Sequence, residues 1–250
     1  MRRLAAAVSI SVLMTATPAH AAACAFAEQG DGHVAEVIDA RSLRLTDGRE
    51  IRLAGIELIA ADDKSALAAL AKDKDVSLRG PDDTPDRFGR QTTFVYLAGS
   101  DITLQAQLLA QGAVLASPDV ADKDCAAALL AAEAEARTAK RGTWATSNVI
   151  KNAESAADIL AGIGRFMLVE GRVLSVRQAG AMTYLNFGRN WTRDFAATIS
   201  RRMIPGVESS GLTLKSLENR RIRVRGWVEA HPGPRIEVVR AGQIEVLSGN

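Results

Sequence analysis

Apolar and polar residues alternate with a period of two in the early segments HVAEVI, SLRLT and EIRLAGI. This period predicts β-strands, since successive side chains of a strand point to opposite faces. The dipeptide Asp47-Gly48 between the second and third segments predicts a tight hairpin. Further strands are predicted at VSLR, TTFVYL and AVLAS. The first half of the chain is therefore expected to be rich in β-structure.

Three segments of the same region have leucine or alanine at helical spacing. The segment from Asp62 to Lys74 begins with acids and ends with lysines, as the helix dipole favours. TLQAQLLAQ is followed by Gly112, which is placed as a C-cap. A long Ala-rich helix is expected to start with Asp122 or Asp124 as its cap and to run to about Lys140.

The later part of the chain repeats the alternating pattern. Residues 147–164 have the Ala-rich amphipathic pattern of a helical linker, and a helix is expected between Val207 and Leu217. From Arg165 the alternating segments are FMLVEGRVLSVR, MTYLNFG, DFAATIS, RIRVRGWVEA, RIEVV and QIEVL. Five or six strands with one helix between the third and fourth are typical of an OB-type barrel. The fold class expected is β-rich α+β, with a small OB-like barrel over residues 165–250.

The first 21 residues have the pattern of a secretory signal. Arg2 and Arg3 precede an apolar run, and Ala19-His20-Ala21 has the small-x-small pattern of a cleavage site. The apolar run is about half of the roughly 20 residues that a membrane-spanning helix needs. We expect cleavage after Ala21 and a secreted or periplasmic mature protein without a transmembrane segment.

Cys24 and Cys125 are the two cysteines of the chain. In an oxidising compartment an isolated pair is more often bridged than free, so we expect a disulfide. The alternative is lipid attachment at Cys24, because HAAAC loosely resembles a lipobox, although it lacks the usual large aliphatic residue three positions before the cysteine.

Charge is distributed unevenly along the chain. Residues 22–164 carry 15 Lys and Arg against 22 Asp and Glu, whereas residues 165–250 carry 14 against 7. Because a phosphate backbone responds to local charge, nucleic-acid binding is expected in the second part. Attraction between two oppositely charged domains explains the same asymmetry, and both interpretations stay open.

Four short motifs, in this order, resemble the staphylococcal nuclease (thermonuclease) family across residues 33–146. They are VIDARSLRLTDGREIRLAGIE, DRFGR, the Gln-Gly pair after the middle helix, and EAEARTAKRGTW. The resemblance implies an OB barrel with three helices over residues 22–146. It also implies calcium-dependent hydrolysis of phosphodiesters in DNA and RNA.

The resemblance further implies a set of catalytic and metal-binding positions, some of which are replaced here. Arg52 and Arg90 match the two phosphate-binding arginines of the family, and Glu57 matches a metal-binding aspartate. Arg41 stands where the other metal-binding aspartate is implied, and Ala60 stands at the general-base position.

These replacements weaken the case for catalysis. Calcium needs six to eight oxygen ligands, and a like charge at 4 Å costs roughly 4 kcal/mol at an effective dielectric of 20. Losing a general base typically costs about 10² to 10⁴ in rate. Asp62 and Asp63 follow Ala60, but we expect them to cap the next helix. We therefore expect no metal and no cofactor, calcium being implied only if the family activity survives.

The three arginines at these positions can still bind an anion. Arg41, Arg52 and Arg90 are expected to form a phosphate-binding pocket, since guanidinium groups bind phosphate in bidentate fashion. In the alternative interpretation, Arg41 and Arg52 are exposed strand residues. Their ion-pair partners would then come from the nearby acids Asp39, Glu50 and Glu57.

Aromatic residues and arginines are interleaved in the middle of the second part. Tyr184, Arg189, Trp191 and Arg193 are candidates for nucleic-acid binding, because single-strand bases stack on exposed aromatics for roughly 1–3 kcal/mol each. In the alternative, such aromatics belong to the core. Tyr184 and Phe187 are three residues apart, so a regular strand would point them to opposite faces. Trp191 is the aromatic residue that we expect to be exposed.

The expected function is binding of nucleic acid or another polyanion, with single-stranded nucleic acid as the partner and with nuclease activity reduced or absent. One alternative is an active but atypical phosphodiesterase. Another is an envelope protein-interaction scaffold, whose binding would lack the salt dependence of a polyanion complex. His33 and His231 have no Cys or His at metal spacing, so no zinc site is indicated.

Overall fold

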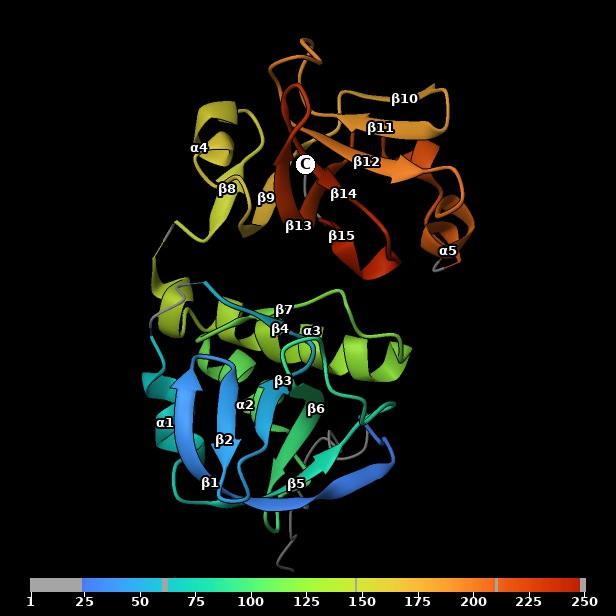
Figure 1. Cartoon of the computed structure of the whole chain (residues 1–250). Helices are drawn as coiled ribbons and strands as arrows, with labels where there is room; N and C mark the ends of the chain where they lie inside the picture. Colours follow the sequence, from blue (N-terminus) through green and yellow to red (C-terminus); the bar gives the residue numbers. More distant parts are fainter. Residues whose placement is uncertain (1–23, 60–62, 147, 210, 248–250) are drawn as a thin grey trace, which may run out of the picture.

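The computed structural model describes residues 24–59, 63–146, 148–209 and 211–247. The predicted signal segment, Ala60 and Asp62 lie outside the described residues. The chain is a β-rich α+β protein, as predicted. In Figure 1, residues 24–146, here called the first unit, lie below residues 148–247, the second unit. No helix in the described ranges is long and apolar enough to cross a membrane.

The first unit is built on a five-stranded sheet. Its order is β1-β2-β3-β6-β5, and β1 pairs with both β2 and β5, so the strands close into a ring. The pairing of β3 with β6 is parallel and the others are antiparallel. These strands are β1 (Glu28–Asp39), β2 (Ser42–Leu45), β3 (Glu50–Leu53), β5 (Asp75–Arg79) and β6 (Arg90–Leu97); β4 (Ile56–Glu57) and β7 (Leu115–Ala116) form a separate pair.

Helices cover one side of this ring. They are α1 (Ser65–Ala71), α2 (Leu104–Gln111), α3 (Lys123–Thr138) and the 3-10 helix η1 (Gly142–Ala145). Asp122 caps α3, as predicted, by accepting a hydrogen bond from the Cys125 amide at 2.8 Å. The α1 helix is shorter than predicted, since the Asp63 carboxylate bonds the Ser65 amide and hydroxyl and the helix begins only after this local turn.

Two of the sequence motifs meet at a pair of glycines. Gly112 ends α2 with a left-handed φ of 71°, as predicted, and its carbonyl accepts a hydrogen bond from the Thr143 amide. A Cβ on Gly112 would lie 2.3 Å from the Arg141 carbonyl oxygen, and one on Gly142 would lie 2.4 Å from that of Gln111. The Gln-Gly and RGTW motifs therefore require glycine because two backbone segments touch there.

The second unit repeats the pairing order of the first. Its sheet runs β10-β11-β12-β14-β13-β9-β8, with β12 parallel to β14 as β3 is to β6. If β9 and β10 are taken as two parts of one strand, the two orders agree and are compatible with an OB-like fold. The strands are β8 (Ile150–Asn152), β9 (Phe166–Arg172), β10 (Ser175–Ala179), β11 (Met182–Asn186), β12 (Ala196–Ser200), β13 (Arg221–Ala230), β14 (Pro234–Glu237) and β15 (Ile244–Val246).

The predicted helical linker over 147–164 is wrong in most of its length. Ile150–Asn152 forms β8, which pairs in parallel with β9, and only α4 (Ala156–Leu160) is helical. Strand pairing with β9 overrides the helix propensity of this segment at residues 150–152. The helix expected between Val207 and Leu217 is likewise divided. It consists of α5 (Ile204–Glu208) and the 3-10 helix η2 (Leu214–Leu217); a third 3-10 helix, η3 (Ala241–Gln243), precedes β15.

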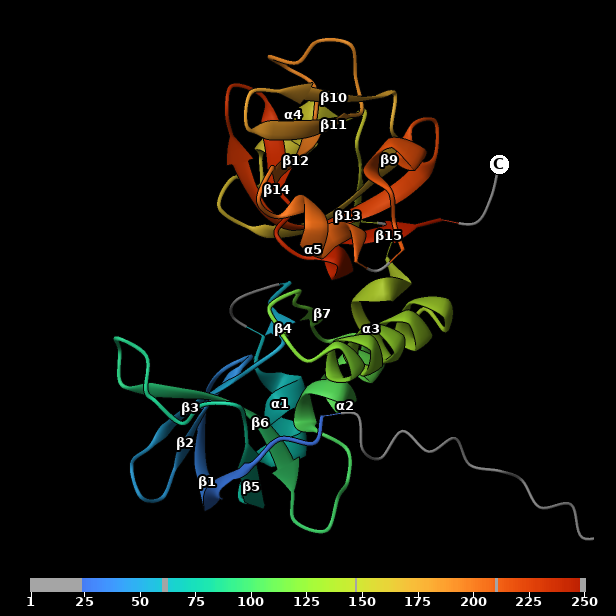
Figure 2. The same ribbon diagram turned by 90° about the vertical axis from the view of Figure 1, so that its right-hand side faces the viewer.

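Each unit has its own hydrophobic core, and a third cluster joins them. Leu115, Ala136 and Trp144 of the first unit pack with Phe166 and Leu168 of the second. Figures 1 and 2 both show β7 and α3 on the side of the first unit that faces the second. The junction between the units is therefore a packed interface and not only a covalent connection.

Cys24 and Cys125 form the predicted disulfide, with 101 residues of sequence separation. The bond ties the start of the first unit to the first turn of α3. A bridged Cys24 has no thiol to offer for lipid attachment, so the structure favours the disulfide over the lipobox alternative.

Replacing both cysteines by serine should lower the free energy of unfolding by up to about 4.7 kcal/mol, the chain-entropy value for a loop of about 100 residues. Denaturant unfolding of the oxidised protein and of the double variant measures the difference. Reduced wild-type protein should have the same unfolding midpoint as the double variant. Labelling of two free thiols in protein that has not been reduced would contradict the bridge.

Candidate nucleic-acid and anion-binding sites

The structure brings Arg41, Arg52 and Arg90 together as the arginine cluster. Arg41 lies in the turn between β1 and β2, Arg52 lies on β3, and Arg90 begins β6. Because β3 runs between β2 and β6, Arg52 stands opposite Ser42 on one side and Thr92 on the other. The three arginines therefore come from three adjacent parts of one sheet.

The pKa of Arg52 is affected by the two neighbouring arginines. Burial lowers the pKa of its guanidinium below the ordinary value, and the positive charges of Arg41 and Arg90 lower it further. The carboxylates of Glu57 and Asp39 oppose this shift. In the part of the chain that the structure describes, the Arg52 side chain has no hydrogen bond and no ion pair. Arg52 is thus the member of the cluster whose positive charge has no direct partner among these residues.

Arg41 is bound to the acid that the family resemblance assigns to the metal. Its Nη1 lies 2.6 Å from Oε2 of Glu57, and the two side chains are 14% and 11% exposed. The other oxygen of Glu57 accepts a hydrogen bond from the Ser117 hydroxyl at 3.4 Å. A cation that bound this carboxylate would therefore lie beside the positive charge of Arg41. The alternative prediction of exposed, ion-paired strand residues is therefore confirmed only for the ion pair of Arg41 with Glu57. Arg41 lies in a turn, neither it nor Arg52 is exposed, and Arg52 has no ion pair with the described residues.

Arg90 is also paired. Its Nε and Nη2 both donate to Oδ2 of Asp86, at 3.0 and 2.8 Å. The Arg90 side chain, followed by backbone amides, lowers the pKa of Asp86 to about 2. In the same loop the ring of Phe88, which is 65% exposed, lies beneath the guanidinium groups of Arg87 and Arg90. An anion entering the cluster therefore competes with Asp86 for Arg90.

A second site lies on the outer face of the second unit. A pocket of about 870 Å³ covers β10, β11, β12 and β14 together with the loops at 187–195 and 231–234, and is here called the sheet-face pocket. Along β11, Thr183 and Leu185 are buried, whereas Tyr184 and Asn186 between them are only partly buried and line the pocket. The period of two along the strand thus separates core from pocket.

Strand register places polar and aromatic residues side by side in this pocket. Tyr184 stands opposite Arg177 on β10 and Thr198 on β12. Ala196 on β12 stands opposite Arg235 on β14. The buried hydroxyl of Thr198 has no hydrogen-bond partner among the described residues. The pocket therefore offers an aromatic surface and two cations on neighbouring strands.

The loop after β11 completes the pocket. Trp191 is 73% exposed, which confirms its predicted exposure, and Arg189 lines the same pocket. Phe187 is buried against Phe195, so Tyr184 and Phe187 face opposite ways, as expected. Three of the four predicted nucleic-acid-binding residues therefore lie together.

Arg193, the fourth, does not line the pocket. Its side chain is 75% exposed and lies 3.5 Å from the carboxylate of Asp194. The neighbouring Asp194 also accepts a hydrogen bond from the Asn190 amide, which closes the loop that carries Trp191. Arg193 thus lies outside the lining of the pocket.

No family model and no curated protein matches this chain. The family resemblance therefore stays a prediction from motifs. Within the described residues, no three His, Cys, Asp or Glu side chains gather closely enough to hold a metal ion.

Sequence reasoning missed several residues of the two sites. Arg235 and Thr198 come together only because β12 and β14 pair in parallel across about 40 residues of chain, which no local pattern reveals. Asp86 could have been predicted from the sequence, because an acid four residues before Arg90 in a short loop is well placed to pair with it. Ser117 had no sequence signal.

Replacing Asp86 by asparagine should strengthen binding of inorganic phosphate by up to about fivefold, the range of an exposed ion pair, because Arg90 loses its competitor. Titration calorimetry measures the affinity. Asp82→Asn is the matched control, since Asp82 bonds only Thr84 of the same loop. Equal affinities for the two variants would contradict a role for Arg90.

The same interaction predicts a pH dependence. The folded pKa of Asp86 is depressed, so its stabilising pairing is present above the ordinary carboxyl pKa and is lost as pH falls toward about 2. The competition between the Asp86 carboxylate and an anion for Arg90 should therefore not change from pH 5 upward.

Proposed function

We propose that this chain binds polyanions and that its preferred ligand is single-stranded nucleic acid. The observation that carries the proposal is the sheet-face pocket, which collects two outward-facing aromatics with three arginines. The aromatics are Tyr184 and Trp191, and the arginines are Arg177, Arg189 and Arg235. Asp194 is the one acid in the lining, so the pocket has a positive balance.

This composition suits unpaired bases better than a duplex. A base stacked on an exposed aromatic gains roughly 1–3 kcal/mol, and only a single strand can present its base faces. The guanidinium groups neutralise the backbone phosphates, which makes binding salt-dependent.

We further propose that the first unit is a staphylococcal-nuclease-like domain with a degenerate active site, followed by an OB-like domain. The four motifs and the repeated strand order support this assignment. The arginine cluster would hold a phosphate without cleaving its ester, Arg52 being the cation that has no ion pair with any described residue. The disulfide supports export to an oxidising compartment, in keeping with the signal pattern.

The residues at the family's metal position do not fit calcium. Calcium needs several carboxylate oxygens, whereas here Nη1 of Arg41 lies 2.6 Å from the one carboxylate that remains, Glu57. We therefore assign no hydrolytic step to this site.

Trp191→Ala should weaken binding of a single-stranded oligonucleotide by roughly 1–3 kcal/mol while changing duplex binding little, because only unpaired bases stack. Trp227→Ala is the matched control, since Trp227 is 50% exposed on β13 and lies outside the pocket lining. Fluorescence anisotropy of the whole chain measures both. An equal effect of the two substitutions would refute the assignment of the pocket.

Arg189→Ala should weaken single-strand and duplex binding alike and reduce the slope of log affinity against log salt by about one. Arg193→Ala should have the smaller effect, since Arg193 lies outside the pocket. Binding that does not respond to salt would instead favour the protein-interaction scaffold.

The wild-type protein should show no calcium-dependent hydrolysis of denatured DNA. Arg41→Asp combined with Ala60→Glu, with Glu57 retained, should create calcium binding that calorimetry can detect, because the variant restores carboxylates at the family positions. Hydrolysis by the wild type that a chelator abolishes would establish the phosphodiesterase alternative.

A further inference from the structure

The two-residue strand β7 is held on both of its edges, although only one edge has a partner strand. On the β4 side, Ile56 and Glu57 stand opposite Ala116 and Leu115, and the Ser117 amide donates to the Gly55 carbonyl at 3.0 Å. The amide and carbonyl of Ala116 point the other way. They are therefore backbone groups that need partners where a third strand would lie.

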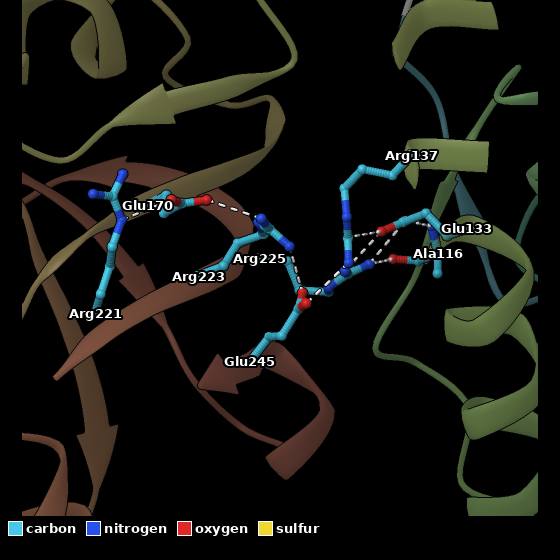
Figure 3. A network of polar contacts seen from close by, with 8 residues as sticks. All are labelled: Ala116, Glu133, Arg137, Glu170, Arg221, Arg223, Arg225 and Glu245. Carbon is cyan, nitrogen blue, oxygen red and sulfur yellow. Dashed lines mark hydrogen bonds and ion pairs between the residues drawn. The ribbon is translucent and has the colours of Figure 1, made fainter. Parts of the chain in front are cut away.

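Two charged side chains take the place of that third strand. Oε2 of Glu133 accepts a hydrogen bond from the Ala116 amide at 2.7 Å, and Nη1 of Arg225 donates to the Ala116 carbonyl at 3.0 Å (Figure 3). Glu133 belongs to α3 of the first unit, but Arg225 belongs to β13 of the second. The second unit thus supplies half of the edge that fixes β7.

Glu133 and Arg225 also bind each other. The guanidinium is bidentate on the carboxylate, at 3.0 and 2.8 Å, and the side chains are 3% and 0% exposed for Arg225 and Glu133. Without Glu133 the buried Arg225 would lose its ion-pair partner, and without Arg225 the Glu133 carboxylate would keep only a longer contact to Arg137, at 3.4 Å. The pair is therefore possible only while the two units are docked.

Further ion pairs fix the strand that carries Arg225. Arg137 of α3 bonds Glu245 at 2.9 Å, and Glu245 in turn accepts from Arg223 at 2.7 Å (Figure 3). Arg223 and Arg221 both bind Glu170 on β9. Alternating charges thus run from α3 across the sheet of the second unit.

The arginine cluster begins on the other side of β7. Glu57 lies on β4, opposite Leu115, and its carboxylate holds Arg41 at 2.6 Å and the Ser117 hydroxyl at 3.4 Å. The Ile56 carbonyl lies 3.4 Å from Nη1 of the same Arg41. Two short strands therefore separate the inter-unit ion pair from the guanidinium of Arg41.

We propose that Arg225 and Glu133 are positioning residues for the arginine cluster, so that anion binding by the first unit depends on docking of the second. The proposal rests on the phosphate-binding role proposed above. Through Ala116 the pair fixes β7, and β7 fixes Glu57 and Ser117, which hold Arg41 beside Arg52. Loss of the pair leaves the core of each unit intact but allows Arg41 to leave the position in which it converges with Arg52 on an anion.

The test uses the whole chain with Glu133→Leu and Arg225→Met combined. Replacing a buried ion pair by apolar residues of similar size is often neutral or stabilising, so the denaturation midpoint should fall only by the cost of the two Ala116 backbone groups that lose their partners. The tether on Ala116 is lost, so hydrogen exchange of the Ser117 amide should accelerate at least tenfold. The affinity for inorganic phosphate should fall by about tenfold.

Arg240→Ala is the control, because Arg240 also crosses the junction, to Asp119 at 3.7 Å, but lies on an exposed pair that does not contact β7. This variant should change neither exchange nor affinity. Arg225→Lys keeps the charge but cannot serve the carboxylate and the carbonyl with one planar fork, so it should give an intermediate effect even if the double variant fails to fold.

Unchanged exchange at Ser117, or faster exchange with unchanged or tighter phosphate binding, would overturn the proposal. A wild-type protein that binds no phosphate would overturn the role proposed for the arginine cluster instead. In that case faster exchange in the double variant would still support the tether on β7.

Discussion

The arrangement of this molecule depends on one buried ion pair, between Glu133 of α3 and Arg225 of β13. Each charge is enclosed by protein, and without Arg225 the Glu133 carboxylate would keep only its longer contact to Arg137, at 3.4 Å. The apolar cluster around Trp144 and Phe166 lies in the same junction and excludes water from it. The two units therefore behave as one structure, and a fragment beginning at residue 165 would also lose β8 and the buried Ile159 of α4.

The junction changes the meaning of the charge asymmetry. Part of the positive charge of the second unit is used at the junction, where Arg225 and Arg240 meet Glu133 and Asp119. Attraction between the units thus explains some of the arginines, as one of the two sequence interpretations proposed. It does not explain Arg177 on β10 and Arg189 in the loop after β11, which line the sheet-face pocket. Figure 1 shows β10 and β11 at the end of the second unit that is farther from the first. Intramolecular docking and the proposed polyanion binding therefore use different arginines.

Features that depend on local chemistry were predictable from the sequence. The hairpin at Asp47-Gly48, the αL end of α2 at Gly112 and the cap of α3 at Asp122 follow from residues that are neighbours in the chain. The alternation along β11 correctly separated Phe187 from Tyr184, and the position of Trp191 after the strand correctly predicted an exposed ring.

Features that depend on distant partners were not predictable. Glu133 lies in EAEAR, whose pattern suggests an exposed helical face, and Arg225 lies on an alternating strand whose arginines look solvated. Nothing local shows that they meet across 92 residues. For the same reason the strand β8 was predicted as part of a helix, because its partner β9 lies outside any local window.

The central claim is that the sheet-face pocket binds single strands and that the protein leaves them intact. Photo-crosslinking of the whole chain to a single-stranded oligonucleotide containing 5-bromodeoxyuridine, in calcium buffer and with peptide mapping by mass spectrometry, tests both parts at once. The account predicts crosslinks at Trp191 or Tyr184 and an oligonucleotide of unchanged length. Crosslinks confined to the first unit, or an oligonucleotide shortened in calcium, would contradict it.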